Sequence, residues 1–391
     1  MSDSSPLSDP NAPRVVIVNN SRETFTSDRS GAIATCVWEL CRAAERRGQA
    51  PEVVTRVGEG SVYPWPHLFA VPESSASPGR AGRVAEAASG AMGWARPAQR
   101  QYASHVLRRL REVRPELVIV NNDPELAAYL SAALGEVRVL HWYHNLETTG
   151  WRFRRRIVLD RRIALAAVSD YLARAVEGVY GLAPHRVSTA RNGVDLERFI
   201  EKNSFAPLPT IGFVGRVAIE KGVDTLLRAC RILAERGRAF GVQIVGDTNW
   251  GFSDGNPYGR EVARLADELA ERGVPIRRLG HVARAQIPAA IAESDVHVVP
   301  SRWDDPAPLT VLEGMATGVP VVASASGGIP ELVWGAGRLV PRENAEALAD
   351  VLDELVQDAE LRRELGEEAR RRAATFTWDE TWAQLVGAGL R

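Results

Sequence analysis

The sequence predicts an α/β protein made of two doubly wound domains, each with a parallel sheet covered by helices. Short apolar runs alternate with longer segments in which apolar residues recur at helical spacing. The alternation restarts near the middle of the chain, after the polar, proline-containing segment Glu201–Pro209. The 391 residues are enough for two such domains. Strand–helix alternation of this kind builds parallel sheets with helices on both faces.

The strands are expected in two series, most of them bounded by Gly, Pro, Asn or Ser. The first series is Val15–Val18, Val53–Thr55, Leu117–Val120, Val137–His141, Leu165–Val168 and Val187–Thr189. The second series is Ile211–Val214, Val242–Val245, Arg277–Leu279, Val296–Val299, Val319–Ala323 and Arg338–Val340. Helical spacing between strands is clear where Val223, Leu226, Leu227, Cys230 and Leu233 fall on one face.

The two series of strands imply where the domains begin and end. We expect residues 1–13 to form a disordered tail, 14–200 an N-terminal acceptor-side domain, and 201–375 a C-terminal domain. Residues 376–391 form a last helix that can pack on its own domain or cross back to the first. The segment Ser74–Arg96, rich in Ala, Gly, Ser and Pro, is expected to be a mobile loop or a short irregular helix. The two domains would face each other across a cleft at the carboxyl ends of their strands.

Bulk composition excludes several function classes. The net charge of -1 gives no global field for nucleic acid or anionic membranes. Three cysteines without a CxxC pair disfavour a disulfide framework and a zinc site, so a reducing, cytoplasmic setting is expected. The polar N-terminus is unlike a signal peptide, and no apolar run of about 18 residues predicts a spanning helix.

The first motif is the stretch IGFVGRVAIEKGVDTLLRA. A buried strand ends at Gly215, Arg216 follows, and Lys221-Gly222 opens a helix. Arg216 as a fork and Lys221 as a point charge could both reach one diphosphate at the helix N-terminus. The residues alone fit equally well with solvated cations beside a turn.

The second motif runs from Pro300 to Val333 and places Asp305 eight positions before Glu313. A strand ends at Ser301, and a helix is expected to start near Leu309. The carboxylates can accept hydrogen bonds from sugar hydroxyls, and the first amides of the helix can hold a phosphate. The alternative is an ordinary N-terminal helix charge at Asp305 and a surface residue at Glu313.

Together these stretches resemble the C-terminal domain of retaining GT-B glycosyltransferases of the glycosyl transferases group 1, family 4-like type. That family includes sucrose, mannosyl, lipopolysaccharide and antibiotic transferases. Its motifs occur here in order, as Gly215-Arg216, Lys221-Gly222, Pro300-Ser301, Asp305, Glu313, Gly318, Pro320-Val321, Ser324, Gly327-Gly328 and Glu331. The family's N-G-V-D turn is matched by Asn192, Gly193 and Asp195, and the N-terminal half matches more weakly, through Gly31. The resemblance covers most of residues 14–391 and implies the GT-B fold.

The resemblance also implies how a nucleotide-sugar donor is held. Gly215 opens the turn, Arg216 and Lys221 bind the diphosphate, and Glu313 binds the ribose hydroxyls. The amides of Leu309 and Thr310 hold the distal phosphate, and the backbone of Gly280, His281 and Val282 contacts the base. Gly31 would let a loop of the first domain approach the donor.

Four residues are expected to act on the reacting groups: Arg216, Lys221, His144 and Asp305. His144 would reach the transferred sugar; the rival His141 is better explained as a satisfied core histidine inside a strand. The family's usual Glu-Pro-Phe-Gly is replaced by Asp305-Pro306-Ala307-Pro308. Asp is one methylene shorter than Glu, and Pro308 has no N–H, so the far side of the donor sugar is expected to differ.

The sequence carries no Asp-x-Asp pair, so we expect metal-independent transfer with cations and helix dipoles neutralising the diphosphate. No cofactor is expected beyond the nucleotide sugar, for which UDP is the expected base. No nucleophile is evident, which fits the front-face retaining mechanism of the family.

The acceptor is the open question. The segment Trp151–Ile163 combines six arginines with apolar residues. This pattern fits either a solvated helix face or a helix that makes a weak peripheral contact with a membrane. Acidic residues on first-domain loops suggest instead a cationic acceptor such as an aminocyclitol in antibiotic biosynthesis: Glu23, Asp28, Asp123, Glu125 and Glu147. A lipid or cell-surface polysaccharide acceptor is the alternative. The expected partners are small molecules, not nucleic acid.

Other protein classes share parts of this pattern. A dinucleotide-dependent dehydrogenase would need a G-x-G-x-x-G turn after a strand, which is absent. A GT-B epimerase or phosphorylase, or a non-catalytic nucleotide-sugar-binding protein, would share the fold and stays open.

Overall fold

The computed structural model describes residues 12–28, 31–71, 97–202, 204–248 and 256–391. The expected N-terminal tail and the segment Ser74–Arg96 lie largely outside these residues. Contacts group the chain into two units, Met1–Asn192 with Trp378–Arg391, and Gly193–Thr377. The first division falls at Asn192–Gly193, earlier than the expected position after residue 200.

The first unit contains a seven-stranded parallel sheet in the order β3-β2-β1-β4-β5-β6-β7. The strands are β1 (Val15–Val18), β2 (Glu52–Arg56), β3 (Leu68–Val71), β4 (Leu117–Asn121), β5 (Arg138–Tyr143), β6 (Ile163–Ala167) and β7 (Val187–Thr189). All residues of β1 and β4 are buried, as expected for central strands with helices on both faces.

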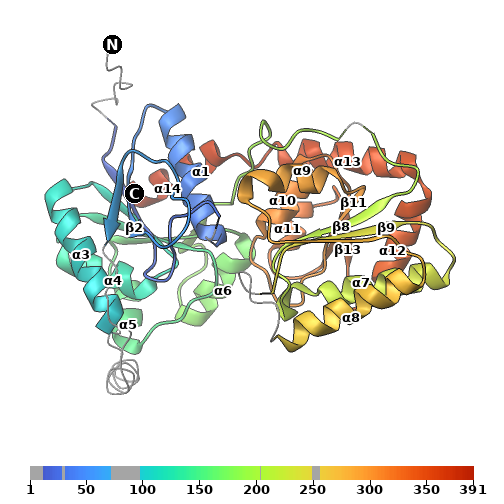
Figure 1. Cartoon of the computed structure of the whole chain (residues 1–391). Helices are drawn as coiled ribbons and strands as arrows, with labels where there is room; N and C mark the ends of the chain where they lie inside the picture. Colours follow the sequence, from blue (N-terminus) through green and yellow to red (C-terminus); the bar gives the residue numbers. More distant parts are fainter. Residues whose placement is uncertain (1–11, 29–30, 72–96, 203, 249–255) are drawn as a thin grey trace, which may run out of the picture. The chain divides into compact units, whose positions relative to one another are not determined.

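The helices of this unit are α1 (Ala32–Arg46), α3 (Pro97–Val113), α4 (Pro124–Ala133), α5 (Trp151–Leu159), α6 (Asp170–Tyr180) and α14 (Trp378–Leu390). Capping residues fix the ends of several of these helices. Asp123 caps α4, which has Pro124 at its first position, and Ser169 caps α6, which ends at left-handed Gly181. Helices α3, α4 and α5 pack in sequence, and α1 packs against α14 (Figure 1).

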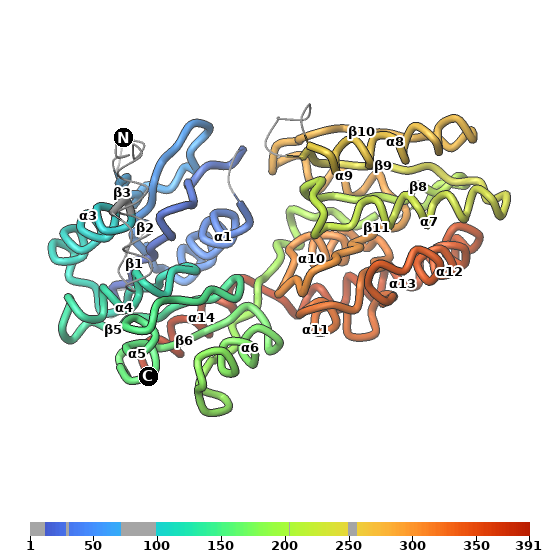
Figure 2. The backbone as a smooth tube through the Cα atoms, turned by 90° about the horizontal axis from the view of Figure 1, so that it is seen from below, coloured from blue at the N-terminus to red at the C-terminus, as the bar shows by residue number. Residues whose placement is uncertain are grey.

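The last helix, α14, belongs to the first unit. It packs beside β4, β5 and β6, as the red segment in Figure 2 shows. Trp382 is almost fully buried, and its indole donates to Gln49 Oε1 at 2.5 Å. Arg46 pairs with Asp379 at 2.5 Å, and the Thr381 hydroxyl donates to the Arg191 carbonyl at 2.6 Å.

The second unit contains a six-stranded parallel sheet in the order β10-β9-β8-β11-β12-β13. The strands are β8 (Thr210–Val214), β9 (Gly241–Val245), β10 (Ile276–Gly280), β11 (Val296–Val299), β12 (Val321–Ser324) and β13 (Arg338–Val340). The longer helices are α7 (Val223–Glu235), α8 (Pro257–Glu271), α10 (Leu309–Ala316), α12 (Ala345–Gln357) and α13 (Ala359–Ala373), with short helices α9 (Ile287–Ala292), α11 (Ile329–Val333), η1 (Ile219–Lys221) and η2 (Arg284–Gln286).

The helices of the second unit form two layers. Helix α7 packs against α8 and α12 on one face of the sheet, whereas α10 packs against α9, α11 and α13 (Figure 1). The main apolar core lies under α7, α8 and α12. The two parallel sheets with helices on both faces confirm the predicted fold class.

One strand was missed by sequence reasoning. β3 is the edge strand of the first sheet, and three of its four residues are not fully buried. Its sequence LFAV is nevertheless a continuous apolar run followed by a proline, so the strand could have been predicted.

Candidate active site

In the second unit, the residues expected to bind the donor follow the carboxyl ends of three strands. Gly215 to Lys221 follow β8, His281 and Val282 follow β10, and Asp305 to Glu313 follow β11. Because all strands of this sheet are parallel, these ends share one edge, where open α/β sheets bind ligands.

The turn after β8 is packed against the loop after β11. Gly222 precedes α7 in a left-handed conformation, with φ of 68°. A Cβ on Gly222 would lie 2.0 Å from the carbonyl oxygen of Pro300, so only glycine fits between the two segments. This contact places Lys221 beside the loop that carries Asp305.

Lys221 and Asp305 form a buried ion pair. The distance from Nζ to Oδ2 is 2.6 Å, with side chains only 21% and 6% exposed. Nζ also lies 5.6 Å from the ring centre of Trp303. The Asp305 carbonyl accepts the N–H of Gly328 at 2.9 Å, which ties this loop to the Gly327-Gly328 turn. Asp305 is therefore an interior group, not an ordinary solvated helix charge.

Arg216 is not brought together with this pair in the structure. Its guanidinium pairs with Glu220 Oε1 at 2.9 Å, and its side chain is 56% exposed. An exposed pair at this spacing stabilises a protein by less than about 1 kcal/mol. A phosphate can therefore compete with Glu220 for Arg216.

Glu313 is buried on α10 and pairs with Arg284, which comes from η2. It is not a surface residue. A ribose at this position would have to share the Glu313 carboxylate with Arg284 or displace Arg284 from it. Sequence reasoning missed Arg284 because it lies outside the motif and meets Glu313 only in the folded unit.

Thr310 is held at the start of α10 by hydrogen bonds on both sides. Its hydroxyl donates to the Val214 carbonyl at 3.2 Å and lies 2.8 Å from His297 Nε2. Since this hydroxyl is already a donor, His297 Nε2–H must donate to it. Burial lowers the pKa of His297 to about 4, although the charge of Glu313 opposes that shift.

The α10 N-terminus is the expected phosphate site. Leu309 and Thr310 are its first residues, whose amides have no partner within the helix. Pro308 precedes them and has no N–H to add.

The segment expected to contact the base follows β10. Gly280 has a φ of 63°, and its carbonyl accepts the Gly246 N–H at 2.7 Å. His281 is exposed and Val282 is half-buried.

In the first unit, Gly31 precedes α1 and already has a partner. Its N–H donates to Glu23 Oε2 at 3.3 Å, and a Cβ would lie 2.6 Å from Glu23 Oε1. Burial raises the pKa of Glu23, and the Gly31 hydrogen bond partly offsets this.

His144 is held by two asparagines at the end of β4. The backbone N–H of His144 donates to Asn122 Oδ1 at 3.0 Å, and the ring nitrogen Nε2 lies 3.1 Å from Asn121 Oδ1. Burial lowers the pKa of His144 to about 3, so the ring is neutral at pH 7.

A chain of hydrogen bonds fixes which ring nitrogen of His144 carries the proton. The Thr55 hydroxyl donates to the Arg56 carbonyl and accepts from Asn19 Nδ2. Asn121 Nδ2 donates to Asn19 Oδ1 at 3.4 Å and to the Val18 carbonyl at 3.3 Å. Asn121 Oδ1 is then the acceptor that faces His144, so Nε2 carries the proton and Nδ1 is an acceptor.

His141 lies inside β5 and is fully buried, as expected of a core residue. Its ring contacts that of Tyr143 edge-on, at 4.0 Å between centres. Neither ring nitrogen has a hydrogen-bond partner among the described residues, so the expectation of a satisfied histidine was wrong on this point. Burial lowers its pKa to about 3, and His144 adds to the shift.

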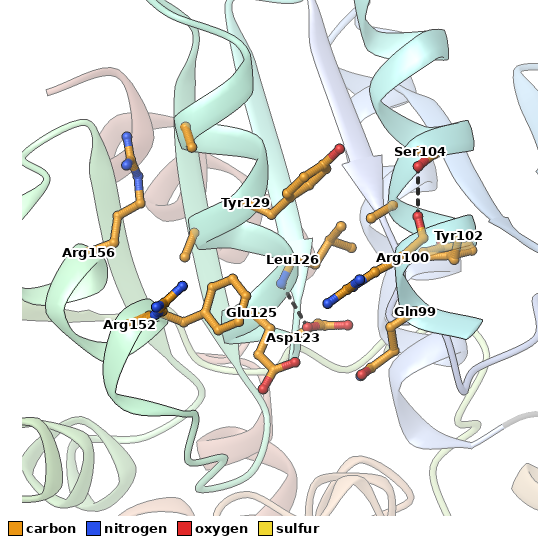
Figure 3. A pocket seen from close by; sticks show the side chains of 14 residues that line it. Gln99, Arg100, Tyr102, Ser104, Asp123, Glu125, Leu126, Tyr129, Arg152 and Arg156 are labelled. Atoms are coloured by element: carbon orange, nitrogen blue, oxygen red, sulfur yellow. Dashed lines mark hydrogen bonds between the residues drawn. The ribbon is translucent and has the colours of Figure 1, made fainter. Parts of the chain in front are cut away.

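Three of the five acidic residues expected on the acceptor side lie close together, since the charges of Glu125 and Glu147 help to raise the pKa of Asp123. Glu23 accepts from Gly31, Asp28 accepts the Ser61 N–H at 3.0 Å, and Glu147 pairs with Arg22 at 3.5 Å. Asp123 and Glu125 line the pocket drawn in Figure 3, together with three arginines.

Across the described ranges, no three His, Cys, Asp or Glu side chains gather as a metal site would require. No helix in the described part of the chain has both the length and the apolar character to cross a membrane.

The fold defines a protein with two Rossmann-like domains of the GT-B kind. A Glycosyltransferase Family 4 model matches residues 33–198, and a Glycosyl transferases group 1 model matches residues 196–372. The two matches follow one another and together take up most of the chain, which is therefore similar to glycosyltransferases in both of its domains.

Similar proteins agree with this assignment. WcaL of Salmonella typhimurium, a glycosyltransferase whose name assigns it provisionally to colanic acid biosynthesis, is 32% identical over 48% of this chain and 46% of its own length. The D-inositol 3-phosphate glycosyltransferase of Corynebacterium urealyticum is 29% identical over 66% of this chain and 67% of its own length. The chain thus spans about half to two thirds of these relatives.

Among solved structures, HepE of Anabaena in complex with UDP and glucose is similar, with a TM-score of 0.72. The match covers 96% of this chain and 99% of that one at 18% identity, which supports the fold.

Proposed function

We propose that this glycosyltransferase moves a sugar from a UDP-sugar to an acceptor hydroxyl, with retention of configuration and without a metal ion. The observation that carries the proposal is the buried Lys221–Asp305 pair at the edge of the sheet that also presents the start of α10. The donor diphosphate would lie between Lys221, Arg216 and the amides of Leu309 and Thr310.

These cations and backbone amides can stabilise the negative charge that develops on the leaving phosphate. The bond between the sugar C1 and the diphosphate oxygen breaks, and a bond from C1 to the acceptor oxygen forms on the same face. The acceptor proton passes to the departing phosphate oxygen, so UDP leaves with that proton. Lys221 and the helix amides stabilise the transition state most, because the leaving oxygen gains negative charge there.

Binding of the nucleoside is assigned to the neighbouring residues. Glu313 would accept hydrogen bonds from the ribose hydroxyls, with Arg284 orienting its carboxylate. The backbone of Gly280 to Val282 would contact the base. His144 would accept a hydrogen bond from the transferred sugar through Nδ1.

The donor sugar is expected to be unusual on its far side. Asp305 is shorter than the glutamate of the family and is held by Lys221 at 2.6 Å. Pro308 supplies no N–H before α10. A sugar that needs fewer hydrogen bonds at this position fits best; hexoses, amino sugars and pentoses are all candidates.

The acceptor has two candidate classes. A cationic aminocyclitol, as in antibiotic biosynthesis, is suggested by acidic residues of the first unit, of which Asp123, Glu125 and Glu147 lie close together. The second class is an acceptor in a lipid or cell-surface polysaccharide. The names of the relatives point to a phosphorylated inositol or to an exopolysaccharide.

A non-transferase of the same fold, such as an epimerase or phosphorylase, is the alternative function. The test is transfer or hydrolysis of UDP-sugars in the presence of EDTA, with the anomeric configuration of the product read by proton NMR. Activity in EDTA with an α product from an α donor supports the proposal. Strict dependence on Mg²⁺, or inversion, would contradict it.

A further inference from the structure

In the second unit, the side chain of Arg302 joins the loop after β11 to the start of α7. Its Nη2 donates to Asp224 Oδ2, and the two side chains are 19% and 3% exposed. Asp224 is the second residue of α7, and Arg302 lies three positions beyond the end of β11. This ion pair therefore connects the two segments that carry Lys221 and Asp305.

The Asp224 carboxylate is held by two further donors. The Tyr258 hydroxyl donates to Oδ1 at 2.7 Å, and Arg228 Nη1 donates to Oδ2 at 2.7 Å. The backbone N–H of Asp224 donates in turn to the Tyr258 hydroxyl at 3.3 Å. Burial raises the pKa of Tyr258, and the hydrogen bond to Asp224 adds to that rise, so the hydroxyl keeps its proton. A buried carboxylate bonded in this way has a fixed position, and it fixes Arg302.

The main chains of the two segments also meet beside Lys221. The backbone N–H of Arg302 donates to the Glu220 carbonyl at 2.9 Å. A Cβ on Gly222 would lie 2.0 Å from the Pro300 carbonyl oxygen and 3.4 Å from Arg302 Cγ. The residues on either side of Lys221 are therefore both in contact with the loop after β11.

The other face of the loop is supported by Arg342. Its Nη1 donates to Asp304 Oδ1 at 2.9 Å and to the Arg302 carbonyl at 3.4 Å. Arg302 Nε lies 3.7 Å from Glu343 Oε2, which is too far for a hydrogen bond. Of Asp224 and Glu343, only Asp224 thus holds the Arg302 guanidinium through a hydrogen bond.

The position of the backbone at Lys221 matters for the proposed chemistry. A cation stabilises a developing phosphate charge best when it is already in place, and a displacement of about 1 Å costs on the order of 100-fold in rate. The lysine side chain is flexible, and its pair with Asp305 holds only its far end. The turn that carries Lys221 must therefore be fixed by other contacts.

We propose that Arg302 is a positioning residue of the donor site: held by Asp224, it fixes the turn that carries Lys221 against the loop that carries Asp305. This inference rests on the proposed function, because it assigns Arg302 a role in the same site. Arg302 acts through Lys221, since its own guanidinium is taken up by Asp224.

The test is a double-mutant cycle between Arg302→Met and Lys221→Gln in the full chain. UDP affinity is measured by calorimetry, and kcat by UDP release from UDP-glucose. Arg302→Met alone should weaken UDP binding and lower kcat by about tenfold each, because Lys221 is displaced. In the Lys221→Gln background it should change either quantity by less than about twofold. Equal losses in both backgrounds would overturn the proposal.

Arg302→Lys and Tyr258→Phe are the conservative variants. Arg302→Lys keeps a cationic donor for Asp224 and should recover most of the loss. Tyr258→Phe removes one donor from Asp224 and leaves Arg302 in place, so it serves in the cycle if Arg302→Met does not fold. It should show a loss of about threefold with the same dependence on Lys221.

Arg238→Met is the matched control. Arg238 follows α7, and its Nε donates to Asp353 Oδ1 of α12 at 2.5 Å, before β9 begins at the amino edge of the sheet. Both variants remove an arginine–aspartate pair and should lower the melting temperature, but Arg238→Met should leave UDP affinity and kcat unchanged. The same loss of UDP affinity in both would indicate general destabilisation and overturn the proposal.

Melting temperatures separate this inference from the proposed function. If wild type neither binds UDP nor releases it from UDP-glucose, the proposed function fails. The positioning role is then read from the same four proteins, because Arg302 should stabilise the Lys221–Asp305 pair. The double variant should melt above the temperature expected from the sum of the two single shifts. Additive shifts would overturn the positioning role as well.

Discussion

Lys221 Nζ lies 2.6 Å from Asp305 Oδ2, in a buried pair that joins the turn after β8 to the loop after β11. The two residues are far apart in the sequence, and Gly222 makes their approach possible by packing against Pro300. The pair places one cation at the edge of the sheet where the donor phosphates are expected.

Replacing Lys221 by Gln should lower kcat/KM on the order of 100-fold or more, because the leaving phosphate loses a cation. The melting temperature should also fall, because Asp305 would remain buried without its charge partner. Arg231→Gln, which removes an exposed cation from α7, is the control and should leave both quantities near wild type. Full activity of the Lys221 variant would remove this residue from the mechanism.

The double change Asp305→Glu/Pro308→Gly restores the family's usual residues at these two positions. It should shift the preference among UDP-sugars, because a longer carboxylate and one added N–H reach the far side of the sugar. Relative kcat/KM across a panel of UDP-hexoses and UDP-pentoses measures this. Retained activity with an unchanged order of donors would show that these positions do not set donor choice.

Glu313→Gln should reduce discrimination between UDP and 2′-deoxy-UDP. Wild type should favour UDP by about tenfold, because a carboxylate gains more than an amide from a ribose hydroxyl. Calorimetric titration of both nucleotides gives the ratio. An equal preference in wild type and variant would place the ribose elsewhere.

Asn121→Leu should lower kcat about tenfold without changing UDP affinity, because His144 loses the partner that sets its tautomer. Nitrogen-15 NMR of the imidazole should show a proton on Nε2 in wild type and a mixture in the variant. Asn145→Ala, beside His144, is the control. A wild-type ring protonated on Nδ1 would contradict the assignment.

The protein should lose stability as the pH falls below about 6.5. Burial lowers the pKa values of His141 and His144 to about 3, and that of His297 to about 4. Between these values and 6.5 the unfolded chain binds protons that the folded chain does not, so the free energy of unfolding falls with pH. Asp123, with its pKa raised to about 6, acts in the opposite direction between about 4 and 6.

Calorimetry between pH 5 and 7.5 measures the effect. Each histidine contributes a slope of up to about 1.4 kcal/mol per pH unit. His141→Phe should flatten the pH dependence, whereas His185→Asn, at an exposed left-handed position, should not. An equal slope in wild type and His141→Phe would indicate that His141 is protonated in the folded state.

The fold was predictable because its strands are apolar runs between turns. The location of Lys221 and Glu313 at the same edge of one sheet was also predictable, since their motifs follow strands of one parallel sheet. β3 was missed, although its sequence LFAV is also an apolar run and a proline follows it.

Side-chain partners were harder to predict. Arg284 meets Glu313 through tertiary structure alone, and the sequence around Arg284 carries no motif. The pair Asn121-Asn122, by contrast, directly follows a buried strand and could have been singled out as polar residues at the carboxyl edge of the sheet. Of the acidic residues expected to act together, Glu23 and Asp28 accept hydrogen bonds from backbone N–H groups, whereas Asp123, Glu125 and Glu147 lie close together.

The most direct test of the donor site is nucleotide release by wild type and Lys221→Gln. UDP-, GDP-, ADP- and dTDP-sugars would be supplied with and without phosphorylated, aminocyclitol and polysaccharide acceptors. We predict acceptor-dependent release of UDP by wild type, reduced on the order of 100-fold or more in the variant. Failure of wild type to bind or turn over any nucleotide sugar would contradict the assignment of Lys221, Arg216 and Glu313 to a donor site.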